Sequence, residues 1–263
     1  MKETVKGLII KRTPFKENDM LLTVLTAEKG KMNVLARGLR KSRRDLSGYQ
    51  TLAYAELEIF DGRGLAVVDD AEVCEAFEGL RKDIESLALA QYFADAVAFV
   101  TTDKGDPELL RLLLNSLALL SEAKAEKLVV KTVFELRFAL EEGFAPSGGG
   151  CAVCGKTPAF WSFSQGLLCE KCAHGDGFSL SDDELMTVNH ILTSSGMRTY
   201  RLPIGTEELS HLSGLTEKYL EYHLEHRFES LVNRQGHSPS KRRRLFIFPY
   251  DVIHRPTKEI ENM

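Results

Sequence analysis

Four cysteines form two close pairs in the second half of the chain. Cys151 and Cys154 make the first pair, and Cys169 and Cys172 make the second after fourteen intervening residues. Two such pairs can close on one tetrahedral metal ion if the segment between them folds back, with each sulfur about 2.3 Å from Zn²⁺. Because all four positions are cysteine, no position is left for a reacting water molecule. The spacing therefore predicts one structural Zn²⁺ ion rather than a catalytic metal.

The residues between the two pairs have the character of a short hairpin. Residues 159–163 are rich in aromatic side chains, residues 164–166 form a turn-like Ser-Gln-Gly, and two leucines follow. Gly155 comes directly after the first pair, where a turn around a metal favours a residue that tolerates positive φ. We therefore expect a zinc module at about residues 148–178.

Two other uses of cysteine fit this chain less well. Two disulfides need an oxidising compartment, but the five cysteines are an odd number and the first residues lack the apolar stretch of a signal peptide. A thioredoxin-type redox pair explains one Cys-x-x-Cys motif but not two. The fifth cysteine, Cys74, follows Ala71 and Val73 and is predicted to be a small buried hydrophobic residue.

Positive charge is concentrated near the start of the chain. The formal net charge is −4, but residues 1–64 hold 13 Lys and Arg against 8 Asp and Glu, whereas the rest holds 21 against 30. Five of the eight residues from 37 to 44 are basic: Arg37, Arg40, Lys41, Arg43 and Arg44. Such clusters bind phosphates and release counterions, so these five are predicted to contact nucleic acid.

Three further basic residues are second-rank contacts with nucleic acid in this interpretation: Lys11, Arg12 and Arg63. The competing interpretation is that the cluster at 37–44 is only a solvated loop. An obvious row of aromatic side chains for stacking on bases is missing, and Phe15 and Tyr49 are the only candidates near the cluster.

The first ~75 residues read as β-strands. Five apolar, β-rich runs are expected at about residues 5–11, 20–26, 32–36, 52–60 and 65–68, with turn residues between them. The run at 52–60 alternates, so that Ala53, Ala55, Leu57 and Ile59 share one face. Five short strands of this kind fit a small closed barrel, for which the OB-fold is the usual compact form.

From about residue 80 the apolar period becomes helical. Helices are expected at about residues 80–100, 107–120, 124–142 and 206–233, and another begins after Ser181 with a capping-box pattern. The predicted class is therefore α+β: an OB-fold domain at residues 1–79, then an all-α domain at residues 80–263 that contains the zinc module. A basic tail, about residues 236–263, includes the run Lys241–Arg244.

Several function classes find no support. No apolar run approaches the ~18 residues of a membrane span. Nucleotide-binding glycine loops and the GxSxG and HExxH motifs are missing from the sequence. The histidines that could serve a hydrolytic enzyme form no nucleophile–base pattern: His174, His190, His211, His223 and His226. We therefore expect a cytoplasmic protein that is not an enzyme.

Beyond these patterns, the chain resembles the RecO family of recombination mediators over roughly residues 3–234. The resemblance rests on the order and spacing of several segments: 17–26, 30–31, 36–41, 57–60, 62–65, 70–73, 134–137, 143–146 and 219–224. It implies an N-terminal OB-fold, a helical second domain and, in many members, a four-cysteine zinc module. The tail after about residue 235 departs from the family pattern.

The same resemblance implies a function without bond-making chemistry. Members bind single- and double-stranded DNA, anneal complementary strands, contact the acidic tail of single-stranded DNA-binding protein, and join RecR to load RecA. The site for that tail is expected to be a basic and apolar patch on the helical domain, and the protein is expected to associate with the nucleoid. An alternative is a zinc-ribbon transcription regulator, but only Lys156 and Lys171 are basic between residues 151 and 172.

Overall fold

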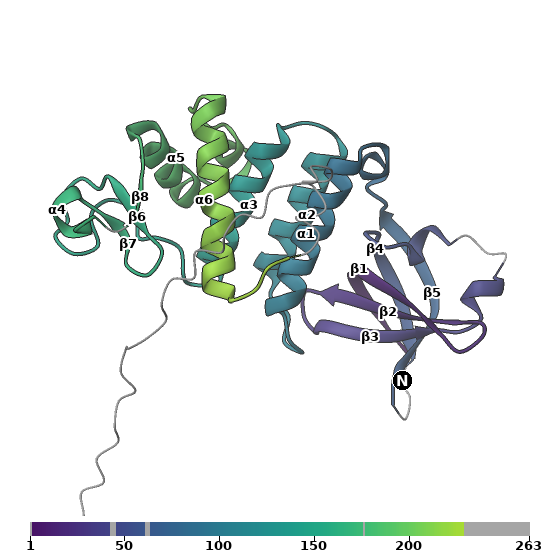
Figure 1. Cartoon of the computed structure of the whole chain (residues 1–263). Coiled ribbons are helices and arrows are strands. Elements are labelled where there is room, and N and C mark those ends of the chain that lie inside the picture. Colours follow the sequence, from purple (N-terminus) through teal and green to yellow (C-terminus); the bar gives the residue numbers. More distant parts are fainter. Residues whose placement is uncertain (1, 43–45, 61–63, 176, 229–263) are drawn as a thin grey trace, which may run out of the picture.

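A computed structural model describes residues 2–42, 46–60, 64–175 and 177–228. A β-barrel lies at one end of the molecule, a group of helices forms the middle, and the cysteine-containing module lies at the other end (Figure 1). Three of the predicted DNA contacts, Arg43, Arg44 and Arg63, and the predicted tail at about 236–263 lie outside the described residues.

The barrel is closed and has the strand order β1-β2-β3-β5-β4. Its strands are β1 (Lys2–Phe15), β2 (Asp19–Thr26), β3 (Gly30–Ala36), β4 (Tyr54–Phe60) and β5 (Ala66–Glu75). All neighbouring pairs are antiparallel except β3 and β5, which run parallel. Five short strands closed in this way form an OB-type barrel, so the predicted α+β class is confirmed.

The period of two in β4 explains how its residues enter the barrel. Ala55, Leu57 and Ile59 are buried, whereas Glu56 and Glu58 lie on the outer surface. Successive side chains of a strand point to opposite faces, so one face of β4 packs into the barrel core with Val24 of β2 and Val34 of β3. The face predicted from the alternation is therefore the buried one.

The helical part begins after the barrel. Its elements are η3 (Glu78–Lys82), α1 (Ile84–Val100), α2 (Pro107–Ser121), α3 (Lys127–Glu141), α5 (Asp182–Thr193), η4 (Gly196–Tyr200) and α6 (Thr206–Leu224). Capping fixes several of the starts, because side chains accept from N–H groups that lack a helical partner. Asp83 caps α1, Asp106 precedes Pro107 at the start of α2, and Ser181 with Glu184 forms the predicted capping box of α5.

The barrel is joined to the helices by backbone contacts as well as by a shared core. Lys31 N–H donates to Thr102 O at 2.7 Å, and Gly105 N–H donates to Glu28 O at 3.3 Å. Gly30 has a φ of +60°, and a Cβ there would lie 2.3 Å from Thr102 O. Only glycine fits this approach, and Leu8 of β1 continues into the apolar core of the helices.

The last helix ends earlier than its sequence pattern predicts. α6 ends at Leu224, because Glu225 adopts a left-handed backbone with φ of 49°. The chain then turns toward α1, where Phe228 is buried and its ring lies 5.5 Å from the ring of Tyr92. Burial of this aromatic ring stabilises the turn, since an aromatic side chain buries a large apolar area.

Cys74 corrects another expectation. The prediction of a small buried residue is wrong, because the thiol lies exposed near the end of β5. Tyr54 of β4 pairs with Glu75 but Ala55 pairs with Val73, so Cys74 lies at an irregularity in the strand pairing and has no partner residue in β4. No helix among the described residues is both long enough and apolar enough to cross a membrane.

Candidate metal centre and nucleic-acid interface

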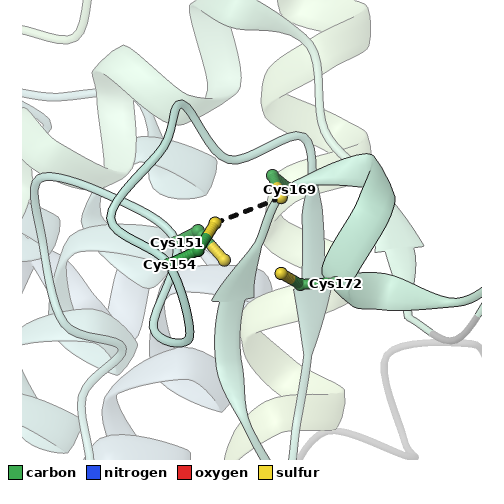
Figure 2. Close-up of side chains that lie close together, drawn as sticks. All are labelled: Cys151, Cys154, Cys169 and Cys172. Atoms are coloured by element: carbon green, nitrogen blue, oxygen red, sulfur yellow. Dashed lines mark hydrogen bonds between the residues drawn. The ribbon is translucent and has the colours of Figure 1, made fainter.

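The four predicted metal ligands come together. Their sulfur atoms all lie within 4.8 Å of one another, and Cys154 Sγ lies 3.6 Å from Cys169 Sγ. Figure 2 shows the four side chains pointing into one small space from two sides. Sulfurs at about 2.3 Å from a tetrahedral ion would be about 3.8 Å apart. The cluster therefore has the size and the donor set for one metal ion.

Two tight turns and a hairpin position these thiols. In the first turn Cys151 N–H donates to Lys156 O at 2.7 Å, while Gly155 N–H donates to Cys151 O at 2.8 Å. Gly155 has the expected positive φ of 74°. The strands β6 (Phe160–Ser162) and β7 (Gly166–Leu168) form the predicted hairpin, which continues into Cys169 and the short helix α4 (Glu170–Ala173).

The surroundings of the four thiols favour charge on some sulfurs and oppose it on others. The pKa of Cys151 is lowered to about 6, chiefly because the backbone N–H of Cys169 donates to its sulfur, helped by Cys154 N–H. The pKa of Cys172 is raised to about 12 because its thiol is hydrogen-bonded to the sulfurs of Cys154 and Cys169. A cation at the centre of the cluster would favour the thiolate at all four positions.

The cysteine module also contacts the last helix. A small sheet of β7, β6 and β8 (Phe178–Ser179) carries it, and Leu167 and Leu180 enter the helical core. His223 of α6 approaches the carbonyl oxygen of Phe163 at 3.0 Å. Burial lowers the pKa of His223, while its hydrogen bond to Phe163 O partly opposes that shift.

The predicted basic cluster begins at the end of β3 and enters η1 (Leu39–Lys41). Arg40 Nη1 donates to Glu17 O at 3.0 Å, and Arg40 N–H donates to Asn18 O at 3.0 Å. Gly38 N–H donates to Asp19 Oδ1 at 2.8 Å. These bonds hold residues 37–41, here called the basic turn, against the turn that joins β1 and β2. Its three cationic side chains are exposed: Arg37, Arg40 and Lys41.

A further cation beside the basic turn was missed by the sequence reading. Lys16 is exposed, has a positive φ of 53°, and holds its Nζ 5.5 Å from the ring centre of Phe15. It lies next to Glu17, whose carbonyl accepts from Arg40. The pairing of β2 with β3 explains why Lys16 lies beside the basic turn, because the start of β2 lies opposite the end of β3. A basic residue in the β1–β2 turn must then lie close to the basic turn.

The other predicted contacts and the two stacking candidates differ in how far their side chains are exposed. Tyr49 is only 5% exposed and belongs to the barrel core, whereas Phe15 is half-buried. Lys11 is exposed on β1. Arg12 is half-buried, and its Nε is buried without a hydrogen-bond partner among the described residues. Phe15 is thus the better candidate for contact with a base.

Three other lysines of the barrel are each paired with a carboxylate. Lys2 pairs with Glu58 at 2.6 Å, and Lys6 pairs with Glu56 at 3.2 Å. Lys29 pairs with Glu3. Within the described part of the chain, the cations of the basic turn form no ion pair with a carboxylate. The positive charge of the basic turn is therefore not balanced by carboxylates of the described residues.

Two family models cover nearly all of this architecture. One described as Recombination protein O N terminal matches residues 1–77, and one described as Recombination protein O C terminal matches residues 81–231. The second alone spans more than half of the chain. The chain belongs to the RecO family of DNA repair proteins.

Relatives match along most of this RecO-family chain. The DNA repair protein RecO of Acetivibrio thermocellus is 31% identical over 233 residues, which cover 86% of this chain and 93% of the relative. That of Moorella thermoacetica is 30% identical over 243 residues, covering 88% and 90%. That of Alkaliphilus metalliredigens is 29% identical over 228 residues, covering 84% and 93%.

The helical part of this RecO-family protein contains a cavity of about 610 Å³ between α2, α3 and η4, here called the helical cavity. Its lining combines three basic side chains (Arg111, Lys124 and Arg137) with three carboxylates (Glu108, Glu122 and Glu141) and apolar residues that include Leu112, Leu119 and Met197. The cations are paired at its rim, as Arg111 is with Glu108. Exposed pairs of this kind are weak and can exchange for an incoming carboxylate.

Proposed function

We propose that this RecO-family protein acts in recombinational DNA repair by binding single- and double-stranded DNA and annealing complementary strands. The observation that carries the proposal is the basic turn, which the barrel holds in place and whose cations are exposed and form no ion pair with a carboxylate of the described residues. Lys and Arg side chains in this state bind phosphates independently of sequence. The protein works by binding rather than by making or breaking bonds.

The DNA contacts in this proposal include the three described cations of the basic turn, with Lys16 beside them. Arg43, Arg44 and Arg63 join them as predictions from sequence alone. Lys11 is a second-rank contact, as is Arg12, which lies half-buried. Phe15, half-buried next to Lys16, supplies an aromatic face at the same end of the barrel.

The proposed resident metal is one Zn²⁺ ion, held by Cys151, Cys154, Cys169 and Cys172. Four thiolates leave no open coordination position, so the ion would hold the module together and would not take part in a reaction. Its binding energy would contribute to folding, because the four ligands meet only when the module is folded.

The partners in this proposal are those that family membership suggests: single-stranded DNA-binding protein, RecR and, through them, RecA on the nucleoid. The acidic tail of single-stranded DNA-binding protein would bind the helical cavity, with its apolar tip against Leu112 and Met197 and its carboxylates near Arg137. The division of work would then follow a boundary near residue 79, with DNA on the barrel and protein on the helices.

An annealing assay tests this function. Two complementary oligonucleotides, each coated with single-stranded DNA-binding protein, are mixed with the full-length protein, and duplex formation is followed by fluorescence. We expect faster annealing with the wild-type protein and loss of the acceleration in the double variant Arg37→Glu/Lys41→Glu. The matched control, Lys156→Glu/Lys171→Glu, reverses two exposed charges on the cysteine module. DNA binding by the wild-type protein without any acceleration of annealing would favour the alternative, a zinc-ribbon or other DNA-binding regulator without annealing activity.

A further inference from the structure

A second cavity, of about 650 Å³, lies where the barrel meets the first long helix. We call it the seam cavity. Its lining comes from β1, from the segment before β4, from η3 and from α1, so both parts of the molecule contribute. The side chains on which the argument depends are Arg12, Arg81, Leu52, Ile84, Leu87 and Ala88.

Two arginines give the seam cavity its charge. Arg81 Nη1 donates to Ala76 O at 2.9 Å and Arg81 Nη2 donates to Thr51 O at 3.2 Å, so carbonyl groups position the guanidinium without neutralising it. The buried Nε of Arg12 has no hydrogen-bond partner in the described residues. Buried donors are normally satisfied, and an arginine fork is suited to a carboxylate.

No carboxylate among the described residues lines the seam cavity. The nearest acidic residues along the chain, Asp83 and Glu85, are engaged elsewhere. Lys127 Nζ lies 2.5 Å from Asp83 Oδ2 and 2.8 Å from Glu85 Oε2, and Asp83 also caps α1. The cavity therefore presents two arginines that no lining carboxylate of the described chain balances.

The α1 side of the seam cavity is apolar and open to solvent. Ile84 is 82% exposed and Leu87 is 39% exposed, and both belong to the first turn of α1. Ala88 and the buried Leu52 continue this surface into the cavity. Large aliphatic side chains exposed together beside polar groups mark surfaces that bind other proteins.

We propose that the seam cavity is a docking site for an acidic, apolar peptide segment of a protein partner. Aliphatic side chains of the segment would cover Ile84, Leu87 and Ala88, and its carboxylates would pair with Arg12 and Arg81. Single-stranded nucleic acid fits less well, because bases stack on aromatic side chains and no aromatic residue lines the cavity in the described chain.

This site is additional to the proposed DNA surface and to the helical cavity. It is formed by different residues from either, with the exception of Arg12, a second-rank DNA contact. A partner bound in the seam cavity would touch the barrel and the helices together. Recruitment at this position would bring that partner next to the DNA-binding domain.

Methyl NMR of the full-length protein, with Ile, Leu and Met methyl groups labelled, tests the assignment. The probe is the peptide Asp-Asp-Leu-Ile-Leu, compared with Lys-Lys-Leu-Ile-Leu. We expect the acidic peptide to shift the methyl signals of Ile84 and Leu87 saturably, both in the wild type and in Met197→Asp, which adds a negative charge to the helical cavity. The basic peptide should have no effect. Absence of a saturable shift at Ile84, or loss of that shift in Met197→Asp, would overturn the proposal.

Variants separate the contributions of charge and apolar surface. The double variant Arg12→Ala/Arg81→Ala should bind the acidic peptide at least about tenfold more weakly, since it removes charge-assisted hydrogen bonds. Ile84→Ser changes an exposed side chain, leaves the fold intact, and should also lower the affinity for the acidic peptide. The neighbouring exposed Lys82→Ala is the control and should bind as wild type. If a thymidine oligonucleotide shifts Ile84 and the peptide does not, the site binds nucleic acid. Unchanged DNA annealing by Ile84→Ser would keep this result separate from the proposed function.

Discussion

The ring centroid of Trp161 lies 4.8 Å from that of Tyr219, so the hairpin between the cysteine pairs packs directly on α6. Trp161 is fully buried and is the only tryptophan of the chain. Buried residues of the hairpin, including Leu167, belong to the same apolar core as α1, α2 and α3. The cysteine module is therefore a part of the helical core rather than an appendage.

This packing leads to a prediction about the metal. The substitution Cys154→Ser should prevent tight Zn²⁺ binding and destabilise the helical domain, because apparent binding energies of about 10–16 kcal/mol for structural zinc are folding energies. Trp161 emission should shift to longer wavelength as the hairpin separates from α6. Elemental analysis, thermal melting and tryptophan fluorescence measure the three effects.

The exposed cysteine provides the control for this experiment. Cys74→Ser alters a thiol outside the cluster, and this variant should retain one Zn²⁺ per chain and the wild-type melting temperature. Zinc-free wild-type protein after purification, or a Cys154→Ser variant that melts like wild type, would contradict the assignment.

Local spacing made the cysteine cluster and the barrel predictable, whereas relations across the fold were not. The alternation in residues 52–60 and the Cys-x-x-Cys pairs are set by neighbours in sequence. The proximity of Lys16 to Arg40 depends on the pairing of β2 with β3, which no single segment shows. The exposure of Cys74 accompanies an irregularity in the pairing of β4 with β5, which the sequence of β5 alone does not show.

The seam cavity illustrates the same limit. Arg12 and Arg81 are 69 positions apart and lie in different structural parts, and only the docking of α1 against the barrel brings them to one cavity. Likewise, the position where α6 ends depends on the contact between Phe228 and Tyr92 of α1. Propensity within the segment from Thr206 onward contains no information about that contact.

A second prediction concerns DNA affinity. Arg37→Glu/Lys41→Glu should weaken binding to unrelated DNA sequences by similar factors, because phosphate contacts carry no sequence information. Each lost contact should also lower the slope of log affinity against log salt by about 0.7–0.9. Fluorescence anisotropy over a range of salt concentrations gives both quantities.

The barrel offers a comparison for the DNA measurement. Lys6→Gln removes a cation that Glu56 already balances, so its affinity and salt slope should stay close to wild type. Arg40 is left unchanged because its guanidinium also anchors the basic turn to Glu17. Equal slopes for wild type and the double variant would exclude the basic turn as the DNA site.

A third prediction tests the helical cavity. Met197→Asp adds a negative charge to the exposed rim of the helical cavity. The variant should bind an acidic tail peptide at least about tenfold more weakly, because opposed like charges cost several kcal/mol. Met186→Asp is a matched control, since Met186 is 55% exposed, Met197 is 57% exposed, and Met186 does not line the cavity. Anisotropy of a labelled tail peptide distinguishes the two, and equal weakening by both would reject the cavity.

A fourth prediction concerns pH. Burial holds the pKa of His223 below its ordinary value of about 6.5, so the unfolded chain binds a proton on this residue more readily than the folded chain does. The stability that neutral His223 provides is complete above about pH 6.5 and is lost as the pH falls toward the folded pKa. His223→Gln should flatten the stability profile below pH 6.5 in denaturant titrations. Because acid affects the cysteine cluster in both proteins, the difference between their profiles isolates His223, and identical profiles would refute the prediction.

The last prediction concerns a buried ion pair between α3 and its neighbours. Lys131 Nζ lies 2.9 Å from Glu135 Oε1, with both side chains almost fully buried, and Lys131 also donates to Ser213 O at 2.9 Å. Tyr92 Oη donates to Glu135 Oε1 at 2.8 Å, so the network joins α1, α3 and α6. Burial raises the pKa of Glu135, and the charge of Lys131 opposes that rise.

Removing only the cation should be costly. Lys131→Met leaves the Glu135 carboxylate buried and unpaired, which should reduce the free energy of unfolding by about 3–5 kcal/mol at neutral pH. The loss should shrink at lower pH, because the pKa of Glu135 in the variant rises further and the folded protein then takes up a proton. Lys131→Met/Glu135→Gln removes the charge but keeps an acceptor for Tyr92, and should recover most of the stability. Urea denaturation of the wild type, of the single variants Lys131→Met and Glu135→Gln, and of the double variant gives the coupling energy of the pair. Additive losses of stability would show that the pair does not act as a unit.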